Sequence, residues 1–233
     1  MNILDKLFEE FCTQYSDEQI RYLGSCLGIA PYRMKDVRTA GQWFMPSLMA
    51  GRDLQGADLR QMDLSGATMT RANLTGAILA GSILTRAHLT GATLKMANLV
   101  GATIVYTDFS HADCQQCDVA RAIAKGANFS FADLTGANFR SSNLTAITGV
   151  FARFDDADMT EVLMPRATCP RASFKRANLT GADLMNGVFP YADFSNANLT
   201  GANLTGATLT GVRLDDAITS DVIWPNNWVR TRS

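Results

Sequence analysis

Residues 197–206 read ANLTGANLTG and residues 177–184 read ANLTGADL, so a unit of five residues recurs in one phase. Counting in steps of five from Leu54 to Leu214 gives 33 consecutive units. Leu or Phe occupies the centre of 24 of the 33 units, and Ala stands two residues before the centre in 23 of the 33. Asn or Asp is common just before the centre, Ser or Thr just after it, and Gly two residues after it. Such regular self-similarity predicts a solenoid.

A period of five matches neither the 3.6-residue period of an α-helix nor the two-residue period of a β-strand. The pattern is satisfied if each unit forms one short side and then turns, so that the centre and the residue two before it both point inward. Gly, Asn, Asp, Ser and Thr then supply the turns. Ala at the second inward position predicts a narrow interior.

Segment 52–216 resembles the pentapeptide-repeat family, whose motif A(D/N)LxG these 33 units carry. The resemblance implies an all-β repeat solenoid, a right-handed quadrilateral β-helix with four units, or 20 residues, in each coil. The 33 units then make about eight coils. Such a solenoid is held together by the stacking of neighbouring coils, and its ends need caps.

The prolines and the weakest units test this expectation. Pro165, Pro170 and Pro190 each follow a centre by one residue, where a turn tolerates a fixed φ and a missing N–H group. The units around 122–124 and 147–149 fit the motif least well but keep the phase. At both places we expect a local bulge rather than an inserted loop.

The two ends of the chain depart from the repeat. Residues 1–50 carry apolar residues at helical spacing and are expected to form an α-helical N-terminal cap or, alternatively, a docking or dimerisation module. Residues 51–217 are expected to form the β-helix, and residues 218–233 a C-terminal cap. Trp224 and Trp228 are the residues that would cover the last coil, although an exposed Trp pair would equally suit a dimer contact.

Composition narrows the class of protein. The 233 residues have a net charge of −1 and are 47% apolar, which describes an ordered protein and gives no indication of direct nucleic-acid or membrane binding. The N-terminus shows no secretory signal pattern, and the chain has no apolar stretch long enough to span a membrane. The five cysteines are therefore expected to be reduced thiols in a cytoplasmic, bacterial protein.

Residues that suggest chemistry are few. Cys114 and Cys117 are spaced like a redox or metal motif, but the phase places both in the interior, as it does Cys169. His88 and His111 fall at outward positions with no nucleophile or ligand set around them. The sequence therefore predicts no enzyme, no cofactor and no metal site.

The densest acidic cluster comprises Asp155, Asp156, Asp158 and Glu161. With 20 residues in each coil, Lys175 would stack above Asp155, and Arg176 above Asp156. This arrangement predicts a surface of paired, solvated charges.

Two phenylalanines do not fit the repeat. Phe131 and Phe151 lie two residues after a centre, where Gly is usual and side chains face solvent, and they are 20 residues apart. Their column predicts an outward stripe of aromatic residues and arginine, which is the composition of interface hot spots. The predicted partner-binding residues are Phe131, Phe151, Arg171, Tyr191, His111, Arg153 and Tyr106. An alternative is that another part of the chain covers the stripe.

Three functions follow from this interpretation. The favoured one is a non-catalytic protein-binding scaffold or regulator, including effector or toxin-neutralising proteins, that acts through the outer surface. The resemblance implies a second, a DNA mimic that binds DNA gyrase and modulates quinolone or toxin sensitivity, but residues 51–233 contain 16 basic and 16 acidic residues, and a mimic requires strong negative potential. The third is a redox protein using Cys114 and Cys117. The partner's identity is open, as is the choice between a monomer and an end-to-end homodimer.

Overall fold

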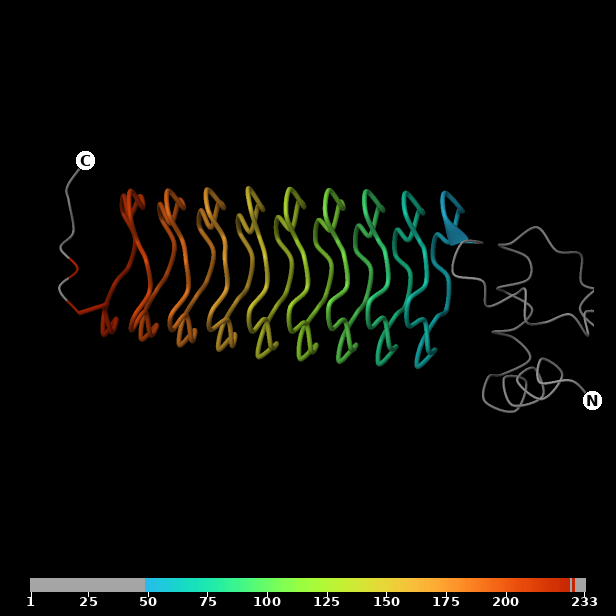
Figure 1. The fold of residues 1–233 in the computed structure, drawn as a ribbon, viewed down its shortest axis with the longest axis horizontal. Coiled ribbons are helices and arrows are strands. Elements are labelled where there is room, and N and C mark those ends of the chain that lie inside the picture. Colours follow the sequence, from blue (N-terminus) through green and yellow to red (C-terminus); the bar gives the residue numbers. More distant parts are fainter. Residues whose placement is uncertain (1–48, 227, 229–233) are drawn as a thin grey trace, which may run out of the picture.

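The computed structural model describes residues 49–226 and 228. Over these residues the chain winds as a stack of similar coils along a straight axis (Figure 1). The N-terminal module expected over residues 1–50 lies, except for its last two residues, outside the described residues.

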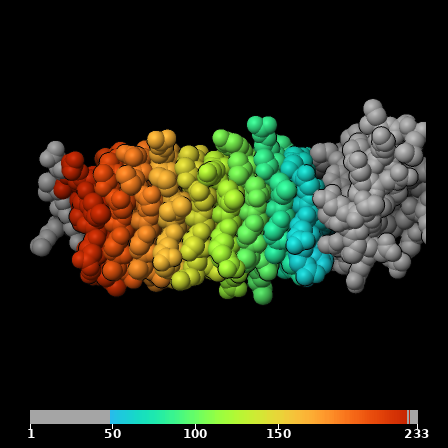
Figure 2. Space-filling model, turned by 90° about the horizontal axis from the view of Figure 1, so that it is seen from below, coloured from blue at the N-terminus to red at the C-terminus, as the bar shows by residue number. Residues whose placement is uncertain are grey.

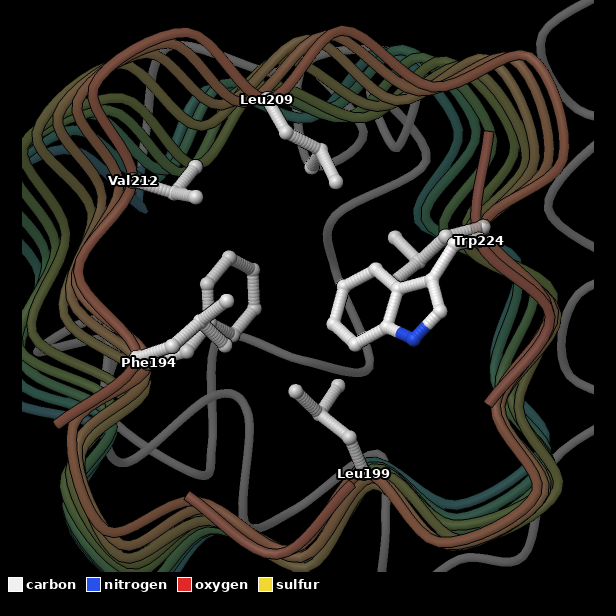
Figure 3. A pocket seen from close by; sticks show the side chains of 7 residues that line it. Phe194, Leu199, Leu209, Val212 and Trp224 are labelled. Carbon is white, nitrogen blue, oxygen red and sulfur yellow. The ribbon is translucent and has the colours of Figure 1, made fainter. Parts of the chain in front are cut away.

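The coils are joined in parallel with a constant register. Every β-bridge pairs residues that are 20 apart, from Asp53 with Asn73 to Asn203 with Ile223. One coil therefore contains four five-residue units, and a view along the axis shows the four sides (Figure 3). Each bridge is isolated, so each side is a single bridged position flanked by turns. The series of β-bridges continues to Ile223, beyond the expected end of the repeat at residue 217.

The unit explains why a period of five is stable, because each of its five N–H groups has an acceptor. In the unit 72–76 the second residue donates to the preceding coil, the third and fifth donate to the following coil, and the first closes a turn. The fourth donates to the side chain of the second. The bonds are Ala72 to Met69 O (3.0 Å), Asn73 to Arg52 O (2.9 Å), Leu74 to Thr93 O (2.7 Å), Thr75 to Asn73 Oδ1 (3.2 Å) and Gly76 to Lys95 O (2.8 Å).

The corners have one conformation throughout. Every fifth residue from Gly51 to Asp221 has a positive φ, and these corner positions hold 13 glycines and 22 other residues. A positive φ at the third residue of a four-residue turn defines the type II class, which glycine favours. The Gly of the motif is therefore explained by the backbone, and the side chains that replace it are all displayed at outer corners.

The prolines lie where the sequence predicts them, at the second position of these turns. In units that carry Asn or Asp before the centre, the N–H group at this position is bonded to that side chain, as in Thr205 to Asn203 Oδ1 at 3.0 Å. The residues two before Pro165, Pro170 and Pro190 are Leu163, Thr168 and Val188, which offer no such amide or carboxylate oxygen. Proline thus occurs at turns where an N–H group would have had no Asn or Asp side chain to donate to.

The interior is filled by the centres and by the residues two before them, and all 33 centres are buried. Phenylalanines form stacks along the axis, with ring centroids 4.9 Å apart for Phe154 and Phe174 and 4.8 Å apart for Phe174 and Phe194. The buried hydroxyl of Ser82 donates to Leu79 O at 2.7 Å, so the few polar groups inside are satisfied.

The expected bulges at the two weakest units are wrong. Backbone bonds continue through both, from Ala124 N to Asn143 O at 2.8 Å and from Gly149 N to Thr168 O at 2.9 Å. At Gly149 the space beside the small centre is taken by the following coil, because an added Cβ would meet Cys169 Sγ at 2.9 Å. The backbone therefore does not have to deviate at this unit.

Candidate protein-binding surface

Five side chains stack along one corner of the rod. We call this set the aromatic ladder; its members are His111, Phe131, Phe151, Arg171 and Tyr191. The ring centroids of His111 and Phe131 are 4.9 Å apart with planes at 2°, and those of Phe131 and Phe151 are 5.5 Å apart at 18°. These are distances at which aromatic pairs attract. The predicted stripe is therefore a continuous stack over five successive coils.

Arg171 extends the stack by cation–π contacts on both sides. Its Cζ lies 5.6 Å from the centroid of the Phe151 ring and 5.8 Å from that of Tyr191. Both distances are within the range of a favourable contact. The described residues offer Arg171 no carboxylate within ion-pair distance, so its charge is held in place by rings alone.

The ladder faces solvent. Phe131 is 51% exposed, Phe151 45% and Tyr191 60%, so the described part of the chain does not cover it. All five members have a positive φ, between 56° and 61°. At the C-terminal end Tyr191 lies flat over Gly211, where an added Cβ would meet the tyrosine ring at 2.5 Å. The stack thus ends against a glycine that leaves room for it.

Tyr106 and Arg153 were predicted with the ladder but lie apart from it. Tyr106 is on the neighbouring corner, is 63% exposed, and packs over Gly126. Arg153 is outside the stack and forms ion pairs with Asp133 at 3.2 Å and Asp155 at 3.6 Å. Its charge is therefore already engaged within the protein.

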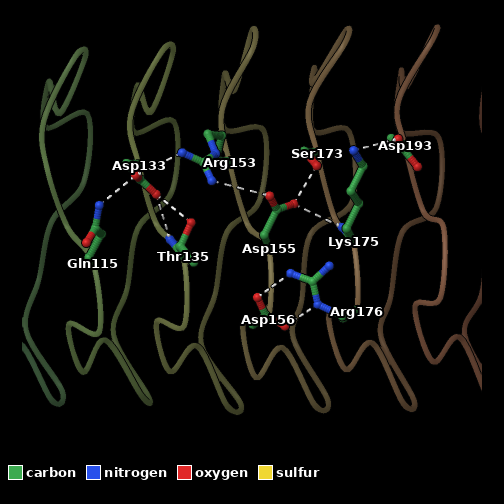
Figure 4. A network of polar contacts seen from close by, with 10 residues as sticks. All are labelled: Gln115, Asp133, Thr135, Arg153, Asp155, Asp156, Ser173, Lys175, Arg176 and Asp193. Carbon is green, nitrogen blue, oxygen red and sulfur yellow. Dashed lines mark hydrogen bonds and ion pairs between the residues drawn. The ribbon is translucent and has the colours of Figure 1, made fainter.

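Arg153 belongs to a chain of polar contacts on the side that follows the ladder corner (Figure 4). Burial alone would raise the pKa of Asp133, but hydrogen bonds from Thr135 and Gln115 and the charge of Arg153 hold it below its usual value. Further along, Lys175 pairs with Asp193 at 3.3 Å. This side therefore compensates its own charges.

The acidic cluster is paired, with one change from the prediction. Arg176 lies above Asp156 as expected and binds it through two contacts of 2.6 Å. This hydrogen-bonded arginine lowers the pKa of Asp156. The ammonium of Lys175, by contrast, reaches forward to Asp193, while Asp155 accepts from the Lys175 N–H at 3.1 Å and from the Ser173 hydroxyl.

The cysteines lie where the phase predicts them. Cys114, Cys117 and Cys169 are free and buried. A hydrogen bond with Cys117, together with burial, raises the pKa of Cys114, and burial raises that of Cys169. Both thiols are thus held in the protonated, unreactive form.

Other features of the described residues suggest no chemistry. His88 and His111 are both exposed, and the described residues contain no group of three or more His, Cys, Asp or Glu that could hold a metal ion. Within the same residues, no helix is long and apolar enough to cross a membrane.

A small apolar hollow lies at the C-terminal end of the axis (Figure 3). Phe194, Leu199, Leu209, Val212 and Trp224 are among its lining residues. It encloses about 10 Å³, roughly the room that one water molecule needs. The indole of Trp224 stacks on Trp228, with centroids 4.5 Å apart, and both pack against the core.

These observations define the class of protein: a four-sided parallel β-helix with a self-packed axis and an unpaired aromatic corner. A family model described as pentapeptide repeats, with 8 copies, matches residues 50–81, 69–104, 82–113, 107–145, 152–189 and 188–216. The chain belongs to the pentapeptide-repeat family. The family's fold is the right-handed quadrilateral β-helix that the sequence predicts.

Three solved structures illustrate the similarity. HetL, a pentapeptide repeat protein involved in heterocyst differentiation regulation from the cyanobacterium Nostoc sp. strain PCC 7120, is 32% identical over 78% of this chain and 86% of HetL, with a TM-score of 0.48. Rfr23 from the cyanobacterium Cyanothece 51142 is 31% identical over 43% of this chain and 66% of its own, with a TM-score of 0.31. QnrB1, a plasmid-mediated fluoroquinolone resistance protein, is 19% identical over 76% and 90%, with a TM-score of 0.37. A search of curated proteins found no match.

Arg166, which lies one corner before Arg171, was not among the predicted binding residues. Five six-residue segments span the side between these two corners in five successive coils: 126–131, 146–151, 166–171, 186–191 and 206–211. The charged residues in these segments are Arg166 and Arg171 alone. We call these five segments the uncharged side, because no charged residue lies between its two corner arginines. Counting charges along each 20-residue column would have identified it.

Proposed function

We propose that this protein is a non-catalytic scaffold or regulator that binds a protein partner through the aromatic ladder. The observation that carries the proposal is the exposure of Phe131, Phe151 and Tyr191 in a continuous stack. Aromatic residues and arginine dominate the binding energy of protein interfaces. A stack that is ordered before binding also loses little conformational entropy on binding.

The rest of the rod supports this choice. The axis is packed with buried side chains, so the described residues offer no large pocket for a substrate. The side next to the ladder compensates its own charges. Contact with a partner therefore falls to the outer corners, where the ladder exposes Phe131, Phe151 and Tyr191.

The test is affinity purification from the cells that produce the protein, with partners identified by mass spectrometry. Wild type is compared with Phe131→Asp/Phe151→Asp and with the matched control Ile83→Asp/Ile123→Asp, whose residues are 41% and 43% exposed on a different side. Circular dichroism establishes that all three proteins fold. We expect one partner to be lost only from the phenylalanine variant.

Two results would contradict the proposal. Identical partners with all three proteins would make the ladder a structural feature. Capture of DNA gyrase subunits by all three proteins would instead favour the DNA mimic. A supercoiling assay would then test that function by measuring whether the protein inhibits gyrase. In the described residues, most aspartates of the sides bond to neighbouring N–H groups or basic side chains, as Asp133 does, so the mimic has less support.

A further inference from the structure

The proposed ladder interface leaves the chemistry of the partner open, and the uncharged side limits it. This side is bounded by two corners, and the unit 166–171 places an arginine at each: Arg166 at the first corner and Arg171 at the second. Both side chains are exposed. Over the five segments from 126–131 to 206–211, no carboxylate is present to compensate them. The preceding segment of this side, 106–111, carries Asp108, which accepts hydrogen bonds from Ser110, Thr90 and Asn128.

Among the described residues, neither guanidinium group has a carboxylate partner. Other arginines, such as Arg153, Arg176 and Arg213, form ion pairs between 2.6 and 3.6 Å. Arg166 and Arg171 form none in the described part of the chain. Arg171 lies between two rings, and its N–H donors form no ion pair with a described carboxylate. The planar fork of a guanidinium matches the two oxygens of a carboxylate.

The surface between the two arginines is uncharged. Its outward residues in three successive coils are Thr148 and Val150, Thr168 and Pro170, and Val188 and Pro190. Val188 is 37% exposed, and the phenylalanine edges of the ladder border the same surface. A partner that fits must therefore combine negative charge with apolar residues.

We infer that the uncharged side and the aromatic ladder together bind an acidic, partly apolar segment of a protein partner, with its carboxylates seated on Arg166 and Arg171. This inference rests on the proposed function and names the partner's chemistry. A protein segment is favoured over a nucleic acid because a phosphate backbone needs many cations, whereas this side offers two and the chain has a net charge of −1.

The test uses the full-length chain and a displayed library of random 12-residue peptides. The chain is immobilised as wild type, as Arg166→Gln/Arg171→Gln, and as the control Arg86→Gln/Arg121→Gln. Arg86 lies four coils before Arg166 on the same corner, and Arg121 lies at another corner, so neither is part of the uncharged side. We expect wild type and control to select peptides enriched in Asp or Glu beside aromatic or aliphatic residues. A selected peptide should bind the Arg166→Gln/Arg171→Gln variant about tenfold more weakly and should bind wild type more weakly at high salt.

The possible outcomes distinguish a failure of this inference from a failure of the proposed scaffold function. Selected peptides that need Phe131 and Phe151 but show no acidic enrichment overturn the inference and leave the scaffold proposal standing. A library that yields no peptide dependent on the two arginines also overturns it, whatever the partner purification shows. Equally tight, arginine-dependent binding of a single-stranded DNA oligonucleotide would overturn it in favour of a nucleic acid.

Discussion

A residue other than glycine carries a conformational cost at a left-handed corner, and this cost is smaller for Asn and Asp than for other residues. At 22 of the 35 corners a residue other than glycine accepts this cost. In the aromatic ladder, ring stacking offsets this cost, because the same conformation directs His111, Phe131 and Phe151 onto one another. At other corners, such as Ala146, no comparable contact compensates it.

Gly101→Ala should therefore destabilise the protein by about 1–2 kcal/mol. Gly101 has a φ of 65°, and an added Cβ would meet nothing within 4 Å, so the change reports conformational strain alone. The matched reverse change, Ala146→Gly, should stabilise it slightly, because relief of strain exceeds the added freedom of the unfolded chain. Denaturant unfolding measures both changes, and equal effects of one sign would contradict the explanation.

The buried thiols predict how stability depends on pH. A thiol whose pKa is raised by folding stabilises the folded state below its unfolded pKa, and this contribution is lost as pH rises above that value. For Cys114 and Cys169 the loss should begin near pH 9, at about 1.4 kcal/mol per thiol for each further pH unit. Unfolding measured between pH 8 and 10 should show a steeper decline for wild type than for Cys114→Ala/Cys169→Ala. Parallel declines would mean that these thiols ionise in the folded protein.

At the scale of one side and its turn, stability depends on the bond between the Asn or Asp before the centre and the N–H group after it. This bond and proline exclude one another at the observed positions: Asn203 caps Thr205, whereas Thr168 and Val188 precede Pro170 and Pro190. Other turns, such as the one at Thr210 after Thr208, have neither the cap nor a proline.

Thr210→Pro should accordingly be tolerated, with a change in unfolding free energy of less than about 1 kcal/mol, because residue 208 is a threonine and proline also restricts the unfolded chain. Thr205→Pro should destabilise the protein by more than about 1 kcal/mol, because Asn203 loses both its N–H and its hydroxyl donor. Thermal unfolding of the two variants is the comparison. A larger loss for Thr210→Pro would show that the cap does not govern where proline fits.

For the whole rod, function depends on register along the axis. Figure 2 shows the coils following one another along one long face in the order of the sequence. Because units are nearly interchangeable, removal of one unit leaves a foldable solenoid. It also moves every preceding residue by one side relative to every following residue.

Deletion of residues 132–136, which read ADLTG, should therefore leave a folded rod whose ladder is split between Phe131 and Phe151 onto different corners. Deletion of the matched unit 72–76, ANLTG, should leave the ladder intact. Both proteins should give similar circular dichroism spectra, and only the second should retain the ladder-dependent partner. Retention by both would place the interface elsewhere.

The amino-acid sequence was sufficient to predict the repeat unit, the burial of Cys114 and Cys117, and the shared column of Phe131 and Phe151. Position within the five-residue period specifies inside, outside or corner, and the 20-residue coil implied by the family resemblance specifies which residues stack. The regular backbone at Gly149, the pairing of Lys175 with Asp193, and the contrast between the ion-paired Arg153 and the ring-stacked Arg171 became visible only in the three-dimensional structure. These features depend on how far long side chains reach and on how neighbouring coils share the interior, which a five-residue period does not encode.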